Sequence, residues 1–346
     1  MSEPRLVRAL RRLPVDRVPV WLMRQAGRFL PEYRELRRRH TLLEIVARPD
    51  LAAEVTMMPL RRFDLDAAIV FADILLPLPA MGVGVRFAKG EGPVVEPRVR
   101  APADVDRLRP VEVRTALAPT LEAIARVRAA LPPDRALIGF AGAPFTVASY
   151  LIEGGGSQDQ AQTKAFLFRY PDAWGRCMER LREVTCDYLA AQVEAGAHAV
   201  QLFDSWVGTL APEDYREFVQ PHTRWILTEF RRRHPEAPVI HFGTGTATLL
   251  PAIAEVGADA VGLDWRVPLG AARRILGPDV ALQGNLDPAL LAAGPLDRLR
   301  RRVRAIVAEG SRHPGYVFNL GHGVLPQTPL EHVAAVVEEV HGFVPS

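Results

Sequence analysis

Short apolar segments alternate with longer amphipathic stretches along the whole chain, and this alternation constrains the fold more than any other feature. The apolar segments are rich in valine, isoleucine and phenylalanine, as buried parallel strands are. There are eight of them: residues 18–23, 67–71, 137–141, 197–203, 239–242, 258–263, 280–283 and 316–320. Helical periodicity lies between them, over residues 115–130, 171–195, 212–234, 246–256 and 296–309. Strand followed by helix predicts an α/β fold with a parallel sheet, and eight such repeats close a (β/α)8 TIM barrel.

A doubly wound open sheet is the main alternative, but no Gly-x-Gly-x-x-Gly follows the first apolar segment. Residues 83–87 and 94–99 predict a hairpin inserted after the second strand. Thr41 with Glu44, and Thr328 with Glu331, match the capping box that begins a helix. No linker or repeat marks a domain boundary. We therefore predict one catalytic barrel domain over residues 1–346, with the active site at the carboxyl ends of the strands.

Composition bounds the class of protein. Of 346 residues, 48% are hydrophobic and 24% charged, as in globular enzymes and unlike disordered or fibrous chains. The net charge is only +3, which gives no reason to expect nucleic-acid binding. Cys177 and Cys186 lack the Cys-x-x-Cys spacing, so we expect reduced thiols in a cytoplasmic protein.

One apolar run has the length of a membrane span. Residues 67–85 carry a single charge, Asp73, but prolines and glycines interrupt them, and a carboxylate in mid-span would be costly in lipid. The N-terminus alternates arginine with apolar residues and lacks the apolar core of a signal peptide. We expect no membrane association.

Polar residues follow the apolar segments, and in a barrel they would meet at the end where catalytic loops lie. In chain order these residues are Arg24 to Arg28, Asp73, Tyr150, Asp204, Ser205, Thr244, Asp264, Asn285, Asp287 and His322. The pair of arginines on one loop suits anionic groups, because the forked guanidinium binds carboxylates with two hydrogen bonds. Gly27 between them is expected to let the backbone bend toward a ligand. The sequence therefore predicts a site for a polyanionic small molecule.

Each candidate also has a structural interpretation. Asp73 follows an apolar run where an unpaired charge is costly, so it is a helix N-cap, a buried partner of an arginine, or functional. Tyr150 would cap the core with its hydroxyl at the rim, and Ser205 would be an N-cap. His322 lies between two glycines, which favours a contact role, and it titrates near neutrality. Asp264 and Asp287 are most simply structural.

Metal and cofactor motifs are not evident in the sequence. His222, His234 and His241 are spread over a helix and a strand end, without a His-Glu-x-x-His or cysteine pair. There is no Walker loop and no dinucleotide fingerprint. We expect neither a metal nor a cofactor.

Several segments resemble the signatures of uroporphyrinogen decarboxylases. The resemblance follows the chain in order over nearly its whole length, with Phe29 where the family often has tyrosine. The matching segments are residues 23–33 (MRQAGRFLPEY), 71–75 (FADIL), 139–146 (GFAGAPFT), 150–154 (YLIEG), 201–206 (QLFDSW), 283–288 (QGNLDP) and 318–323 (FNLGHG).

This resemblance implies a homodimeric barrel in tetrapyrrole synthesis, working without a cofactor. Such an enzyme converts uroporphyrinogen III to coproporphyrinogen III, and four acetate side chains lose CO2 and become methyls. Asp73 would receive the pyrrole N–H groups of the folded macrocycle. Arg24 and Arg28 would bind carboxylates, and one of them, or a water that it holds, is the candidate proton donor. The other implied substrate contacts come from Gln25, Ala26, Gly27, Tyr150, Ser205 and His322, with Arg37 a further candidate.

Two other functions use a similar set of residues. Related barrels transfer methyl groups from corrinoid proteins with zinc held by a His-x-Cys pair, but here the corresponding stretch is His241-Phe242-Gly243, without the cysteine. A tetrapyrrole carrier would use the same arginines and would not require Asp73.

Overall fold

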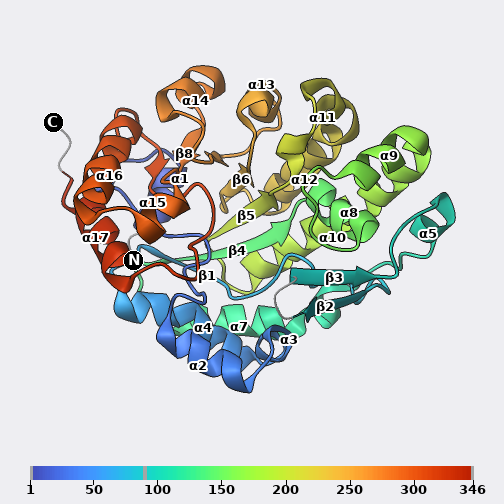
Figure 1. Cartoon of the computed structure of the whole chain (residues 1–346), viewed down its shortest axis with the longest axis horizontal. Helices are drawn as coiled ribbons and strands as arrows, with labels where there is room; N and C mark the ends of the chain where they lie inside the picture. Colours follow the sequence, from blue (N-terminus) through green and yellow to red (C-terminus); the bar gives the residue numbers. More distant parts are fainter. Residues whose placement is uncertain (1–2, 89–91, 344–346) are drawn as a thin grey trace.

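The computed structural model describes residues 3–88 and 92–343, and its core is one curved parallel sheet with helices on its outer side (Figure 1). Seven strands form this sheet in the order β1-β4-β5-β6-β7-β8-β9. Six of the connections between neighbouring strands are therefore parallel crossovers, as the alternation of strand and helix predicts. The strands are β1 (Ala67–Ile69), β4 (Ala136–Gly142), β5 (Ala199–Asp204), β6 (Val239–Gly243), β7 (Ala260–Gly262), β8 (Ala281–Gln283) and β9 (Tyr316–Val317).

The first of the eight expected strands, over residues 18–23, is not a strand. Val20 forms a single parallel bridge with Phe318, and its carbonyl oxygen accepts the N–H of Asp66 at 2.8 Å. The segment therefore lies between the two edges of the sheet without a continuous ladder. Pro19 is one physical reason, because proline has no N–H to donate to a neighbouring strand.

Helices fill the stretches between the strands, and two of the predicted helices are each divided near a proline. The helix expected over residues 212–234 is two helices, with Val219 between them at φ −126° and ψ −50° and Pro221 in the first turn of the second helix. The helix expected over residues 115–130 is divided at Leu117: residues 115 and 116 end one short helix and the next begins at Ala118, because Pro119 cannot donate to the preceding turn. The helices before the middle of the chain are α1 (Arg5–Leu10), α2 (Pro31–Arg39), α3 (Leu42–Val46), α4 (Pro49–Arg62), α5 (Pro102–Asp106), α6 (Val113–Ala116), α7 (Ala118–Ala130), α8 (Pro144–Glu153) and α9 (Ala161–Arg169). The later ones are α10 (Pro171–Glu194), η1 (Val207–Thr209), α11 (Pro212–Phe218), α12 (Gln220–Arg233), η2 (Ala247–Leu249), α13 (Leu250–Ala254), α14 (Leu269–Leu276), α15 (Pro288–Ala293), α16 (Leu296–Gly310) and α17 (Leu330–His341).

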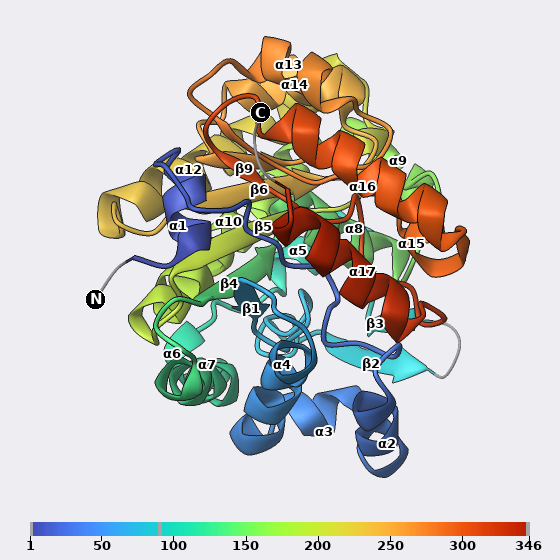
Figure 2. The ribbon, with the colours of Figure 1, turned by 90° about the vertical axis from the view of Figure 1, so that its left-hand side faces the viewer.

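The outer core is built by amphipathic helices that lie against the sheet (Figure 2). In α10, Trp174, Cys177, Met178 and Leu181 are buried at the three- and four-residue spacing of one helix face. This helix packs against α8, α12 and β4. Cys177 and Cys186 both lie on it, buried and with free thiols.

Of the smaller predictions, the hairpin is confirmed: β2 (Gly84–Ala88) pairs antiparallel with β3 (Gly92–Glu96), and the turn at residues 89–91 lies outside the described residues. The capping box of Thr41 and Glu44 is confirmed at the start of α3. The second box is wrong. Helix α17 begins at Leu330 with Pro329 as its N-cap, one residue later than this box requires, and no side-chain hydrogen bond from the described residues caps it.

Inside the sheet a line of amide side chains crosses the core. The indole N–H of Trp21 donates to Oε1 of Gln283 at 2.9 Å, and Nε2 of Gln283 donates to Oε1 of Gln201 at 3.0 Å. All three side chains are buried, so these hydrogen bonds satisfy polar groups that water cannot reach. They also fix the first segment against β8 and β5.

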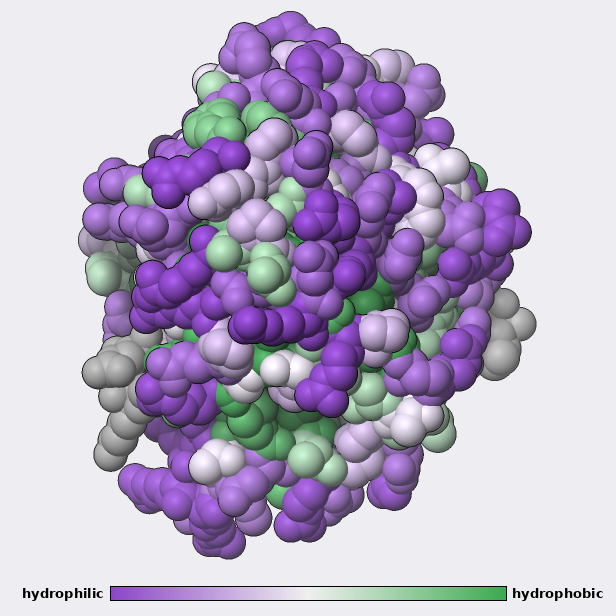
Figure 3. Space-filling model, turned by 90° about the vertical axis from the view of Figure 1, so that its right-hand side faces the viewer, coloured by the Kyte–Doolittle hydropathy of each residue, from purple (hydrophilic) through white to green (hydrophobic). Residues whose placement is uncertain are grey.

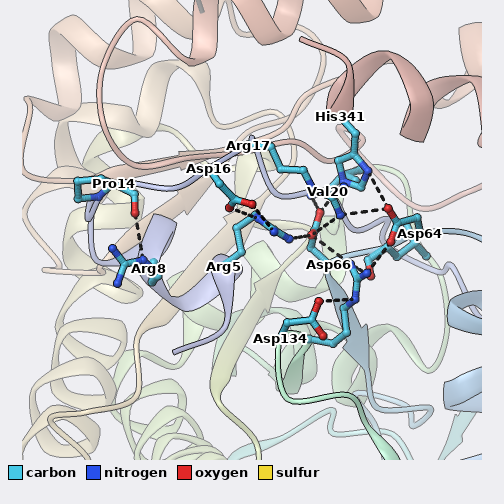
Figure 4. A network of polar contacts seen from close by, with 12 residues as sticks. Arg5, Arg8, Pro14, Asp16, Arg17, Val20, Asp64, Asp66, Asp134 and His341 are labelled. Carbon is cyan, nitrogen blue, oxygen red and sulfur yellow. Dashed lines mark hydrogen bonds and ion pairs between the residues drawn. The ribbon is translucent and has the colours of Figure 1, made fainter. Parts of the chain in front are cut away.

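Asp66, immediately before β1, joins the two ends of the chain (Figure 4). Its buried carboxylate accepts from Arg5 of α1 at 2.5 Å, from Arg135 at 3.2 Å and from His341 of α17 at 2.8 Å. The backbone N–H of Val20 also donates to it at 2.8 Å. Burial alone would raise the pKa of Asp66, but these donors lower it below 3.8. We call Asp66 and these partners the Asp66 cluster.

None of the helices in the described residues is both long and apolar enough to cross a membrane.

Candidate active site

The loop after the first apolar segment places Arg24 at the centre of the candidate site. Arg24 is exposed and has φ 61°, a left-handed conformation that residues other than glycine rarely adopt. A Cβ at Gly27 would lie 2.7 Å from the carbonyl oxygen of Arg24, so this position requires glycine. The sequence predicted conformational freedom at Gly27. In the structure the unusual conformation is at Arg24, and Gly27 provides space for it.

Gln25 anchors this loop to the sheet. Its Oε1 accepts the N–H of Leu22 at 2.9 Å, and its Nε2 donates to the carbonyl of Ala67, the first residue of β1, at 2.9 Å. The residue is 1% exposed, so the side chain is not available to a ligand. Ala26 next to it is half-buried.

Asp73 follows β1 and is partly buried, with Oδ1 accepting the N–H of Leu75 at 2.9 Å. Burial raises the pKa of Asp73 above 3.8, although the N–H of Leu75 and the charge of Arg24 oppose this change. Arg24 acts on it through charge alone, because no ion pair joins these two described side chains. Asp73 thus caps a turn, but its carboxylate has no fixed cation to compensate for its burial.

Tyr150, in the last turn of α8, lies beside Asp73. Its ring contacts that of Trp206 at a centroid distance of 4.1 Å and an angle of 33°. Burial and the charge of Asp73 raise the pKa of Tyr150 to about 12, while Arg24 opposes them. The hydroxyl is therefore a neutral hydrogen-bond donor near pH 7. Ser205, between β5 and Trp206, is half-buried, and its carbonyl oxygen accepts from Thr244 at 2.5 Å.

His322 follows β9 and lies against the same loop. Its Nδ1 accepts the N–H of Gly323 at 2.6 Å, which leaves the proton of the neutral ring on Nε2. A Cβ at Gly323 would lie 2.6 Å from Cγ of Arg24, so the two loops are in close contact. Burial, the charge of Arg24 and that of Arg266 lower the pKa of His322 to about 4, against the opposing effect of Asp264. The expectation that His322 titrates near neutrality is wrong.

The structure thus brings three of the predicted residues close to Arg24: Asp73, Tyr150 and His322. Arg28 is exposed on the same loop, and its charge acts on Tyr33 of α2. Within the described part of the chain, no hydrogen bond or ion pair joins Arg28 or Ser205 to Asp73. Arg37 is directed elsewhere, because its Nη1 donates to the carbonyl of His40 at 2.7 Å.

Two aspartates at strand ends have the structural roles expected of them. Asp264 is buried and accepts the N–H groups of Gly245 and Arg266. Asp287 accepts the N–H of Ala289 at 2.8 Å and caps α15. Sequence reasoning missed Arg266, which follows Asp264 and Trp265. An arginine two residues after a strand-end aspartate was the available signal.

The candidate metal ligands do not converge. Over residues 3–88 and 92–343, no three or more histidine, cysteine, aspartate or glutamate side chains are grouped so as to hold a metal ion. His241 is buried on β6, with Nε2 3.9 Å from Oδ2 of Asp204. His222 lies within α12 and His234 at its C-terminal end.

The side of the molecule that carries α8 and α9 has a hydrophobic recess framed by hydrophilic residues (Figure 3). A hydrophobic recess framed by hydrophilic residues suits a ligand with a hydrocarbon framework and polar substituents. Elsewhere in the candidate site, Phe71 and Ile74 follow β1 and Phe203 lies near the end of β5, and all three are partly buried hydrophobic residues.

Comparison with known proteins identifies the family. The family model described as uroporphyrinogen decarboxylase (URO-D) matches residues 1–343. The chain belongs to the uroporphyrinogen decarboxylase family. The uroporphyrinogen decarboxylase of Sorangium cellulosum is 53% identical over 339 residues, which cover 98% of this chain and 96% of that protein. The one of Chloroflexus aggregans is 50% identical over 341 residues, covering 98% and 95%.

A solved structure resembles this member of the family in fold. It is a methyltransferase from Methanosarcina mazei, with a TM-score of 0.82 over 97% of this chain and 96% of that one. The two sequences are 22% identical, so the similarity establishes the shared architecture and not the chemistry.

Proposed function

We propose that this protein decarboxylates the four acetate side chains of uroporphyrinogen III to methyls, giving coproporphyrinogen III for heme and tetrapyrrole biosynthesis. Family membership over nearly the whole chain supports this function. Within the site, the observation that best supports this function is the partly buried carboxylate of Asp73. It lies close enough to Arg24 for that charge to oppose the rise in its pKa, and close enough to Tyr150 for its own charge to raise the pKa of the hydroxyl.

The reaction needs an electron sink, and the substrate itself supplies one. Protonation of a pyrrole carbon next to the acetate-bearing position makes the ring a cation. The bond to the carboxylate then breaks, CO2 leaves, and its electron pair neutralises the cation. The exocyclic methylene that remains is protonated to a methyl group, and the ring proton is returned. The protein must therefore position protons and stabilise a transient positive charge.

Asp73, Arg24 and Arg28 are the residues we assign to this chemistry. Asp73 accepts the pyrrole N–H groups and offsets the cation that forms on the ring. Its partly buried position strengthens this effect, because water screens the carboxylate less there than at the surface. Arg24 and Arg28 bind substrate carboxylates, and one of them, or a water that it holds, is the proton donor.

The remaining contacts orient the macrocycle. Tyr150 and the Nε2–H of His322 are neutral donors to acetate and propionate groups, with Ser205 on the adjacent loop. Gln25, Ala26 and Gly27 give the loop its shape, and Gln25 does so through its bonds to the sheet.

We further propose that the curved sheet closes as a (β/α)8 barrel forming one domain over residues 1–346. The bridge of Val20 to Phe318, together with its bond to Asp66, supports the closure, because it puts an eighth segment between β9 and β1. A homodimer in the cytoplasm, with no nucleic-acid or membrane partner, is proposed from the family resemblance, the two free thiols and the net charge of +3.

Turnover of uroporphyrinogen by purified protein tests the function. After dialysis against a chelator, the protein should release CO2 and form tetrapyrroles with progressively fewer carboxylates, measured anaerobically by chromatography. Stoichiometric zinc, with activity lost on chelation, would favour the corrinoid methyltransferase. Tight binding of uroporphyrinogen without CO2 release would favour the carrier.

A further inference from the structure

Arg266 projects from the loop after β7 and is held in place by a buried carboxylate. Its Nε lies 3.2 Å from Oδ1 of Asp264 and its Nη2 lies 2.9 Å from Oδ2. The Asp264 side chain is fully buried, whereas that of Arg266 is 54% exposed. One edge of the guanidinium is thus used inside the protein, and Nη1 on the other edge has no hydrogen-bond partner among the described residues.

An exposed tryptophan stacks against one face of the Arg266 guanidinium. The guanidinium carbon of Arg266 lies 4.9 Å from the ring centroid of Trp265, which is 39% exposed. Such stacking restricts a long side chain that would otherwise sample many rotamers. Arg266 is therefore held at one edge by Asp264 and over one face by Trp265, and it presents its remaining donors to solvent.

This arginine lies at the same rim as the candidate active site. A Cβ at Gly321 would overlap the backbone N of Trp265 and lie 3.0 Å from Cα of Asp264, so the loop that carries His322 packs directly on the loop that carries Arg266. His322 in turn adjoins Arg24 through Gly323. The charges of Arg24 and Arg266 both act on the His322 ring.

We propose that Arg266 binds a propionate carboxylate of the tetrapyrrole and so completes, across His322, the anion-binding rim that Arg24 and Arg28 begin. This inference rests on the proposed function and names one further contact in it. Arg24 and Arg28 come from a single loop, so a macrocycle with acid groups around its whole periphery leaves carboxylates on the far side without a cation.

A propionate is the better partner than an acetate for energetic reasons. The acetate carboxylate must lose its charge as CO2 leaves, so a strong cation bound to it would stabilise the ground state more than the transition state. A propionate keeps its charge throughout, and binding it contributes equally to substrate and product. It is also one methylene longer, which suits a group that lies at the rim while the reacting ring lies at Asp73.

Substituting Arg266 by glutamine, which removes the charge but retains a donor for Asp264, tests the proposal. The dissociation constant for coproporphyrinogen, which keeps the propionates and is not turned over, should rise about tenfold, as loss of one charge-assisted hydrogen bond at a partly exposed site implies. KM for uroporphyrinogen should rise similarly, with kcat within about twofold of the wild type. Arg266→Lys should recover part of the affinity, since charge remains without the fork.

Arg216→Gln is the matched control. Arg216 of α11 is 43% exposed and makes a comparable two-bond pair with Glu255, at 2.6 and 2.8 Å. It should leave both constants unchanged. An unchanged dissociation constant in Arg266→Gln, or a parallel fall in kcat, Tm and oligomer mass, would overturn the proposal in favour of a structural role. Because product binding is measured without turnover, a wild type that releases no CO2 would refute the proposed function separately from this contact.

Discussion

The partly buried position of Asp73 destabilises its ionised carboxylate in the folded protein, but the same position suits the proposed reaction. Since its pKa is raised, the folded state binds the Asp73 proton more tightly than the unfolded chain does. Its contribution to the free energy of unfolding therefore declines as pH rises from 3.8 through the raised value, and at pH 7 the ionised carboxylate is destabilising. Asp73→Asn should consequently leave Tm at pH 7 unchanged or higher, while lowering the single-turnover rate by about 10²–10³ because the cation loses its counter-charge.

The control for this prediction is Asp287→Asn, which replaces another strand-end aspartate with a residue that caps helices equally well. It should change neither Tm nor rate. The advantage of Asp73→Asn in Tm should shrink as pH falls toward 4. If Asp73→Asn melts early and still decarboxylates at the wild-type rate, Asp73 is a scaffold residue.

At the scale of elements, the site depends on two loops in contact, one after the first apolar segment and one after β9. Gly323 does not have a positive φ, so alanine is compatible with its backbone, but its Cβ would displace the Arg24 side chain. Because that side chain is flexible and exposed, we expect Gly323→Ala to move Arg24 without unfolding the protein. KM should rise about three- to tenfold, as partial loss of a carboxylate contact implies, with Tm lowered by no more than about 2 °C.

Gly156→Ala provides the comparison, because a Cβ there meets nothing within 4 Å. Kinetics and thermal melts of the two variants, measured together, separate a local displacement of Arg24 from a general effect of alanine in loops. Equal KM values for both variants would mean that Arg24 does not hold the substrate.

At the scale of the whole molecule, the Asp66 cluster holds the N-terminal helix α1 and the C-terminal helix α17 to the start of β1. Replacing Asp66 by Asn would leave Arg5 and Arg135, both mostly buried, without their shared carboxylate. We expect the free energy of unfolding to fall by about 3 kcal/mol in urea denaturation. Activity per folded molecule should be retained, because the cluster lies at the amino end of β1 and the candidate site at the carboxyl end.

Asp16→Asn is the paired measurement for this cluster. Asp16 also binds Arg5, at 2.6 Å, but is 69% exposed, so its loss should change the free energy of unfolding by less than about 1 kcal/mol. Similar losses in the two variants would show that burial does not set the strength of the cluster.

Local patterns in the sequence were sufficient for the parallel α/β class, several of the longer helices and the hairpin, because strand and helix periodicity depend on neighbouring residues. They were also sufficient to select Arg24, Asp73, Tyr150 and His322, since residues that follow parallel strands must lie at one end of the sheet. The helix break at Val219 and the late start of α7 both follow from prolines that were visible in the sequence.

Only the tertiary structure decided what depends on contacts between distant segments. The first apolar segment, residues 18–23, has the composition of a strand but forms a single bridge. How far it pairs depends on the positions of β9 and β1 on either side of it, which are distant in the sequence. His322 has an ordinary sequence context, yet its pKa is near 4, because the fold buries it beside Arg24 and Arg266. The orientation of the Arg266 side chain depends on its ion pair with the buried Asp264 and on its stacking over Trp265, both of which form only in the folded protein. Burial, and the charges that folding brings near, cannot be read from neighbours along the chain.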